Sequence, residues 1–135
     1  FKPNIPFGFH KELHKFANTS MDVSDGLLVD LRRLVGKKKL SFLINYNLLP
    51  KSNFFKNIFK QKNKKKDKYL FSGDDYQILF TAKNVHRNKI SEASKKWNQK
   101  VTKIGTIVNN RNNCVLINNK IIKIKDYRGY IHNFK

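Results

Sequence analysis

Two short acidic clusters hold the residues of this sequence that are best suited to chemistry. The chain has only nine Asp and Glu residues against 29 Lys and Arg, and four of the nine lie in the runs Asp22-Val23-Ser24-Asp25-Gly26 and Gly73-Asp74-Asp75-Tyr76. A chain so poor in carboxylates that places two of them in one glycine-bounded turn uses them for more than solubility. The first run leads directly into an apolar stretch of helical character, residues 27–31.

The first cluster has the composition of a site for magnesium-bound phosphate. Mg²⁺ takes one or two carboxylates and fills its other positions with water and phosphate oxygens. Asp22 and Asp25 lie three residues apart across a turn and are able to face one cavity. Gly26 permits close backbone approach, Ser24 offers a hydroxyl, and the following helix supplies N–H groups and a positive dipole end. The pattern alone slightly favours a plain helix N-cap, and both roles can coexist in one turn.

The second cluster places two acids at the start of an expected strand. Neighbouring strand residues point to opposite sides, so Asp74 and Asp75 are expected to have different roles. One can contact a substrate donor or a cation while the other holds the turn. A plain Asp-rich turn explains the spacing equally well.

Hydrophobic periodicity predicts a mixture of helices and strands around these clusters. The helix after the first cluster has its apolar residues on one stripe and a stop at Gly36, while Asp30 is expected on its surface. The mixture predicts one α/β (α+β layered) domain over residues 1–135, a mixed sheet packed by helices. The expected helices cover residues 9–17, 24–35, 54–59 and 84–97, and the expected strands cover 19–23, 40–46, 76–81, 101–108, 114–117 and 121–124.

Size and composition exclude several classes of protein. The 135 residues suffice for one core and are too few for two ordinary domains. The sequence has no run of eighteen apolar residues, so no membrane span is predicted. Residues 1–6 lack the basic, apolar and small-residue zones of a secretory signal, and we therefore expect a cytoplasmic protein. The single Cys114 excludes an internal disulfide and is expected to be a small buried hydrophobe. His10 and His14 are expected to be solvated helix residues.

The formal charge of +20 raises the question of a nucleic-acid partner. The excess is carried by Lys, whereas base-reading interfaces favour Arg, of which the chain has few. Many Asn, Ile and Phe accompany the Lys, a composition that an AT-rich genome produces by default. We therefore expect no nucleic acid, and we expect the lysine-rich segment 60–68 to be an exposed loop, with a basic arm as the alternative.

Several motifs together resemble the C-terminal half of thiamine-monophosphate kinases, in the aminoimidazole ribonucleotide synthetase-like superfamily. The most specific is Met21-Asp22-Val23-Ser24-Asp25-Gly26-Leu27-Leu28-Val29-Asp30-Leu31. A second, residues 72–81, resembles the family's Gly-Gly-Glu-Asp-Tyr-Glu-Leu-Leu-Phe-Thr block. The others are the Leu-Pro-x-Ser turn in 40–52, the Ile-Gly pair in 101–107, and a divergent Gly-Tyr-Asp-His-Phe in 129–134.

The resemblance implies a phosphoryl transfer. Enzymes of that family move the γ-phosphoryl group of ATP to thiamine monophosphate, which gives thiamine diphosphate, with Mg²⁺ and without a phosphoenzyme. It further implies that Asp22 and Asp25 bind Mg²⁺ and that Ser24 contacts ATP.

The resemblance also implies where the thiamine phosphate substrate lies. Asp74 or Asp75 would contact it, and Tyr130 would lie against the thiamine rings, a sensible neighbour for a cationic thiazolium. The chain departs from the family pattern at three positions. Asp74 and Gln77 stand where the family has Glu, and Ile131 stands where Asp is usual.

The family's N-terminal half has no counterpart in this sequence. The resemblance implies that the half supplies further magnesium carboxylates and most nucleotide contacts, and that complete enzymes are homodimers. We therefore expect a fragment, or one part of a split gene, that is inactive alone. Two alternatives are another superfamily member, resembling aminoimidazole ribonucleotide or selenophosphate synthetase, and a basic nucleic-acid-binding module.

Overall fold

The computed structural model describes residues 8–36, 40–51, 77–109, 114–117 and 120–124. The helix expected over 54–59 and the lysine-rich segment lie outside these residues. The described elements are the 3₁₀ helices η1 (Phe9–Lys15), η2 (Tyr46–Leu48) and η4 (Asn84–His86), the α-helices α1 (Leu27–Val35) and α3 (Arg87–Lys96), and the strands β1 (Ala17–Asp22), β2 (Ser41–Asn45), β3 (Ile78–Ala82), β4 (Gly105–Val108), β5 (Cys114–Ile117) and β6 (Lys120–Lys123).

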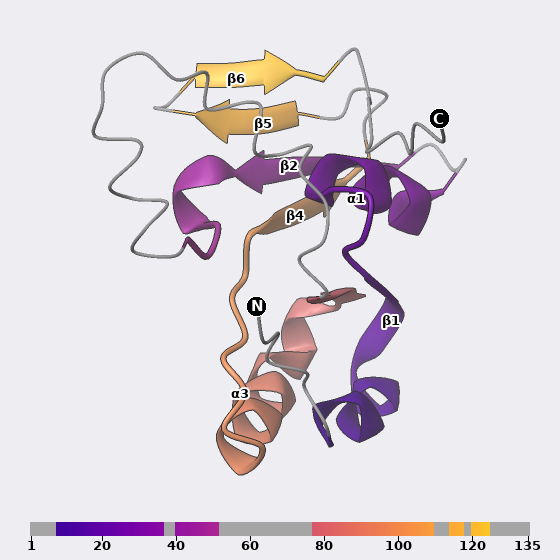
Figure 1. Cartoon of the computed structure of the whole chain (residues 1–135), viewed down its shortest axis with the longest axis vertical. Helices are drawn as coiled ribbons and strands as arrows, with labels where there is room; N and C mark the ends of the chain where they lie inside the picture. The colour runs from indigo at the N-terminus through magenta and orange to yellow at the C-terminus, as the bar shows by residue number, and fades with distance from the viewer. Residues whose placement is uncertain (1–7, 37–39, 52–76, 110–113, 118–119, 125–135) are drawn as a thin grey trace, which may run out of the picture.

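The strands form two sheets (Figure 1). β1 pairs with β3 in a two-stranded antiparallel sheet. The second sheet has the order β4-β2-β5-β6, in which β2 runs antiparallel to β4 and parallel to β5, and β5 and β6 form the expected hairpin. The prediction of a mixed α and β fold is confirmed.

The larger core lies between α1 and the four-stranded sheet. Leucines at helical spacing put an apolar stripe on α1, and Leu28 and Leu31 are buried against Phe42 and Ile44 of β2. The helix ends where predicted, because Gly36 adopts a φ of 71° that other residues avoid. Both the helix and its stop were therefore readable from the sequence.

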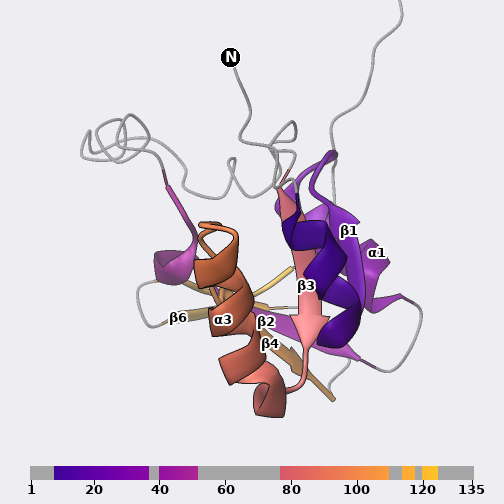
Figure 2. The same cartoon turned by 90° about the horizontal axis from the view of Figure 1, so that it is seen from below.

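A smaller core lies at the other end of the molecule, between η1 and α3 (Figures 1 and 2). Phe9 and Phe16 are buried there and meet Phe80 of β3, with ring centroids 5.6–6.4 Å apart. These tilted aromatic contacts and Ala93 of α3 close the core.

The two-stranded sheet joins the two cores. Side chains alternate along a strand, so neighbouring residues of β3 serve different cores. Leu79 is buried in the larger core, and Phe80 packs in the smaller one. β1 also contributes to both cores, Met21 to the larger and Ala17 to the smaller, because a register shift between Ala17 and Thr19 interrupts the alternation along this strand.

Some elements differ from the expectation. The helix predicted over 9–17 is a 3₁₀ helix that ends at Lys15, because the chain from Ala17 onward pairs with β3. The helix expected over 84–97 divides into η4 and α3, and Val85 of η4 is 79% exposed. The strand predicted from residue 101 begins only at Gly105. Among the described residues, each helix is too short or too polar to cross a bilayer.

Gly105 is required by close packing in the four-stranded sheet. It lies opposite Ile44 in the β2–β4 register. A Cβ at this position would clash with the backbone oxygen of Leu43 and lie 3.0 Å from the Cα of Ile44. Backbone atoms cannot rotate away as the end of a side chain can, so the glycine of the Ile-Gly pair has a packing reason.

We predict that Gly105→Ala lowers the free energy of unfolding by about 1–3 kcal/mol, the usual cost of overpacking. Urea denaturation followed by circular dichroism measures the change. Thr106→Ala is the matched control, because Thr106 is exposed on the same strand and its loss should cost under about 0.5 kcal/mol. Equal stability of the two variants would contradict the packing argument.

Glu12 is a buried carboxylate of η1 that binds Lys96 at the end of α3 and Trp97, the residue that follows this helix. Lys96 donates to its Oε1 at 2.9 Å, Trp97 Nε1 donates to the same oxygen at 3.2 Å, and Lys15 donates to Oε2. These hydrogen bonds, led by the one from Lys15, lower the pKa of Glu12 from 4.5 to about 2. The carboxylate form is therefore favoured in the folded chain.

We predict that Glu12 stabilises the fold above about pH 4.5 and that this contribution disappears as the pH falls toward about 2. The sign follows because the folded pKa is lower than the unfolded one, so the unfolded state takes up the proton first. Denaturation of the native chain and Glu12→Gln at several pH values between 7 and about 2.5 tests this. The stability difference between the two should shrink with acidity. A constant difference contradicts the assignment.

Candidate functional site

The first acidic cluster forms the turn between β1 and α1. Its start is fixed by Val23, which is buried and whose N–H donates to the carbonyl of Gln77 at 2.9 Å. Its end is Gly26, with a φ of 121° that suits only glycine. The turn is thus bound at its start to the chain leading into β3 and continues at its end into α1.

Asp30 organises this turn from within the helix. Its Oδ2 accepts hydrogen bonds from the backbone N–H groups of Ser24 and Asp25, both at 3.0 Å. The residue is 0% exposed. The expectation that Asp30 lies on the surface is wrong, because the two amides and a guanidinium compensate the desolvation of its carboxylate.

The N-cap interpretation of the turn is also wrong. Gly26 occupies the N-cap position of α1, and no side chain there caps the helix. Instead of a side chain from the turn reaching into the helix, the side chain of Asp30 reaches back into the turn. The amides of Ser24 and Asp25 therefore bind this carboxylate, which frees the two side chains from a capping role.

Arg33 connects two of the acids. Its Nη1 donates to Oδ1 of Asp30 at 3.0 Å and to Oδ2 of Asp25. These interactions, the one with Asp25 foremost, raise the pKa of Arg33 above its ordinary value. The Arg33 side chain is 53% exposed, so Arg33 lies at the solvent side of the cluster.

Sequence reasoning missed Asp30 and Arg33, although a signal was present. Counting from Leu27, positions 30, 31 and 34 are the i+3, i+4 and i+7 places of one helix face. An aspartate on that apolar stripe must be buried, and a buried carboxylate needs donors. Arg33, three residues further along the helix, is the donor within local reach.

Asp22, Ser24 and Asp25 lie together on this turn. Asp22 ends β1 and is exposed, and among the described residues its carboxylate has no hydrogen bond or ion pair. Asp25 is 35% exposed and engages Arg33 through one oxygen. Oxygen donors of this kind, accessible to solvent and backed by a fixed turn, fit the needs of Mg²⁺.

The described residues contain no group of three His, Cys, Asp or Glu side chains that could enclose a metal. Asp22 and Asp25 are the carboxylates of the turn that reach solvent, Asp22 exposed and Asp25 partly so. Mg²⁺ usually keeps water and phosphate among its ligands and takes one or two carboxylates from the protein.

The other predicted site residues, Asp74, Asp75 and Tyr130, lie outside the described residues. Gln77 is the first described residue after the second cluster in sequence, and its carbonyl binds Val23 of the first cluster. The pairing of β1 with β3 thus brings the start of β3 to the acidic turn, with Asp22 opposite Ile78. His10 and His14 are exposed and Cys114 is half-buried, as expected.

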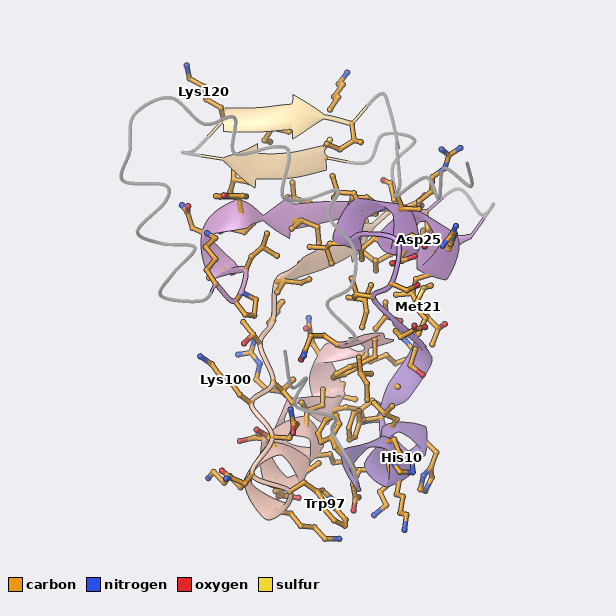
Figure 3. All side chains as sticks on the ribbon, in the orientation of Figure 1. His10, Met21, Asp25, Trp97, Lys100 and Lys120 are labelled. Atoms are coloured by element: carbon orange, nitrogen blue, oxygen red, sulfur yellow. The ribbon has the colours of Figure 1, made fainter. Side chains whose placement is uncertain are left out.

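A hollow of about 580 Å³ lies elsewhere, between η1 and α3. Its lining includes Lys15 and Lys96, which both pair with Glu12, and also Glu92. Figure 3 shows Asp25 beside α1 and Trp97 at the opposite end of the molecule, next to α3. The hollow is thus separate from the acidic turn. The turn is the candidate site, because its carboxylate and hydroxyl oxygens are of the kind that bind Mg²⁺ and phosphate.

The structure and its acidic turn define a mixed α and β domain that solved structures share. A thiamine-monophosphate kinase from Stenotrophomonas maltophilia K279a superposes with a TM-score of 0.71 at 26% identity, over 89% of this chain and 37% of that one. AaThiL complexed with AMPPCP and TMP gives a TM-score of 0.61 at 31% identity, over 92% of this chain and 36% of that one.

Curated relatives give the same family. The thiamine-monophosphate kinase of Buchnera aphidicola subsp. Schizaphis graminum is 34% identical over 124 residues, 89% of this chain and 37% of the relative. That of Aquifex aeolicus is 38% identical over 81 residues, 59% of this chain and 26% of the relative. A scan against protein-family models gives no match.

The resemblance to thiamine-monophosphate kinases predicted from the motifs is therefore confirmed in sequence and in fold. The chain covers 26–37% of the length of these two relatives. It corresponds to a part of such a kinase and not to the whole of it.

Proposed function

We propose that this chain is the C-terminal domain of an enzyme that phosphorylates thiamine monophosphate to thiamine diphosphate with ATP and Mg²⁺. The similarity to thiamine-monophosphate kinases over most of the chain carries the proposal. The structure of AaThiL with AMPPCP, an ATP analogue, and TMP supports the choice of nucleotide and substrate. A cytoplasmic location stays a prediction.

In this proposal the acidic turn holds the cation that accompanies the nucleotide. Mg²⁺, when bound, neutralises charge on the phosphate oxygens. Asp22 and the free oxygen of Asp25 supply its protein ligands, and the Ser24 hydroxyl donates to a phosphate oxygen. The fixed turn contributes by orienting these groups before the ligand arrives, which reduces the entropy lost on binding.

The substrate side of the proposal rests on the second cluster. Asp74 or Asp75 would contact thiamine monophosphate, and Tyr130 would lie against its rings. The hydrogen bond from Val23 to Gln77 supports this proposal, because it holds the residue that starts the described chain after the second cluster against the acidic turn. In this proposal the γ-phosphoryl group passes from the nucleotide at the turn to the substrate.

The proposal also requires a second part of the enzyme. This chain covers about a third of the length of its relatives, so the remaining nucleotide and metal contacts are expected on an N-terminal kinase domain. We propose a homodimer for the complete enzyme. The 135-residue chain is expected to be inactive alone.

We predict that co-expression with the N-terminal part of a related kinase yields ATP- and Mg²⁺-dependent formation of thiamine diphosphate. In that complex Asp22→Asn and Asp25→Asn should each lower kcat/KM about 100-fold or more, because each removes a charged ligand of the Mg²⁺ that would neutralise the phosphate oxygens. Chromatography of thiamine diphosphate measures the product.

Glu92→Gln is the matched control. It makes the same carboxylate-to-amide change on an exposed residue of α3, away from the turn, and should leave the rate within about twofold. Full activity of the doubly substituted Asp22→Asn, Asp25→Asn complex would refute the metal assignment. Product formation by the 135-residue chain alone would refute the need for a second domain.

A further inference from the structure

Asp30 is a buried charge that the fold keeps at a cost. Moving a carboxylate out of water costs several kcal/mol, and Asp30 has no exposed surface. Its two oxygens accept three hydrogen bonds at 3.0 Å, two from turn amides and one from Arg33. These donors come from both sides of the helix start, so the carboxylate fixes the turn relative to α1.

The same bonds change what the turn can bind. Free N–H groups at the start of a helix attract phosphate, but the amides of Ser24 and Asp25 already bind a carboxylate. The negative charge of Asp30 lies directly beneath them. Asp25 and Asp30 share the guanidinium of Arg33, so these three described residues carry net negative charge, and Asp22 is a further acid at the start of the turn.

We propose that Asp30 is a positioning residue that makes this turn a cation site and prevents it from acting as a phosphate cradle. It takes up the two amides that a phosphate group would use, and it holds Asp25 and Ser24 so that their side chains meet the ligand. The turn then engages a nucleotide only together with a divalent cation. This inference rests on the proposed function.

The test uses amide NMR signals of the 135-residue chain, with Mn²⁺ as the probe for Mg²⁺. In the native chain the amides of Ser24 and Asp25 should be protected from hydrogen exchange, although they precede the helix. Mn²⁺ should broaden these two signals, and ATP with EDTA should leave them unshifted. Fast exchange at both amides, or a shift of both by ATP with EDTA, overturns the proposal without any variant.

The variant Asp30→Asn provides a second measurement. It keeps the shape of the side chain and removes its charge, and it places an amide NH₂ group against the N–H donors that the carboxylate now accepts from. We expect the exchange protection of both amides to fall at least about tenfold and the Mn²⁺ dissociation constant to rise by about 10- to 100-fold, as for other groups that orient metal ligands. The amides of β2 should keep their protection. Glu92→Gln, the same change on an exposed acid, should alter neither quantity.

The outcomes separate this inference from the proposed function. If Asp30→Asn loses the amide protection but binds Mn²⁺ as tightly as the native chain, Asp30 has no positioning role and the inference fails while the metal site stands. If the native chain shows protected amides but no broadening by Mn²⁺, the metal assignment fails and takes the cation role of Asp30 with it.

Discussion

The buried carboxylate of Asp30 is the interaction on which the candidate site depends. It is paired with two backbone amides and Arg33, and no part of it is exposed to water. Removing one member of such a group leaves the others buried without partners, which is far more costly than losing a surface pair. The backbone of the turn is therefore held at Ser24 and Asp25, whose amides bind this carboxylate.

The pairing of β1 with β3 positions the acidic turn in the molecule. The hydrogen bond from Val23 to Gln77 continues that pairing beyond the last residue of β1 and ahead of the first residue of β3, so the turn starts where the sheet ends. Leu79 and Phe80 of β3 pack in different cores, so the strand that binds the turn through Gln77 is held on both faces. Few ways remain for the turn to move without disturbing a core.

Much of the fold could be predicted from the sequence, because short-range hydrophobic spacing determines many of its elements. The leucine spacing of α1, its end at Gly36 and the β5–β6 hairpin are all short-range patterns. The end of η1 at Lys15 was not readable, because it depends on Ala17 pairing with Ala82, far along the chain. The acidic motif located the site, but its internal bonds needed coordinates, since a spacing does not say which group accepts from which.

The charge of the chain acts differently at long and short range. Nine acids against 29 bases give a positive field that attracts anionic nucleotides and phosphorylated substrates. Salt screens such a field beyond roughly 10 Å, so it can favour approach but cannot orient a ligand. At short range, Asp25 and Asp30 share the guanidinium of Arg33, which leaves this group of three described residues with net negative charge. Under the proposed function, an anion drawn to this surface therefore binds at the turn together with Mg²⁺.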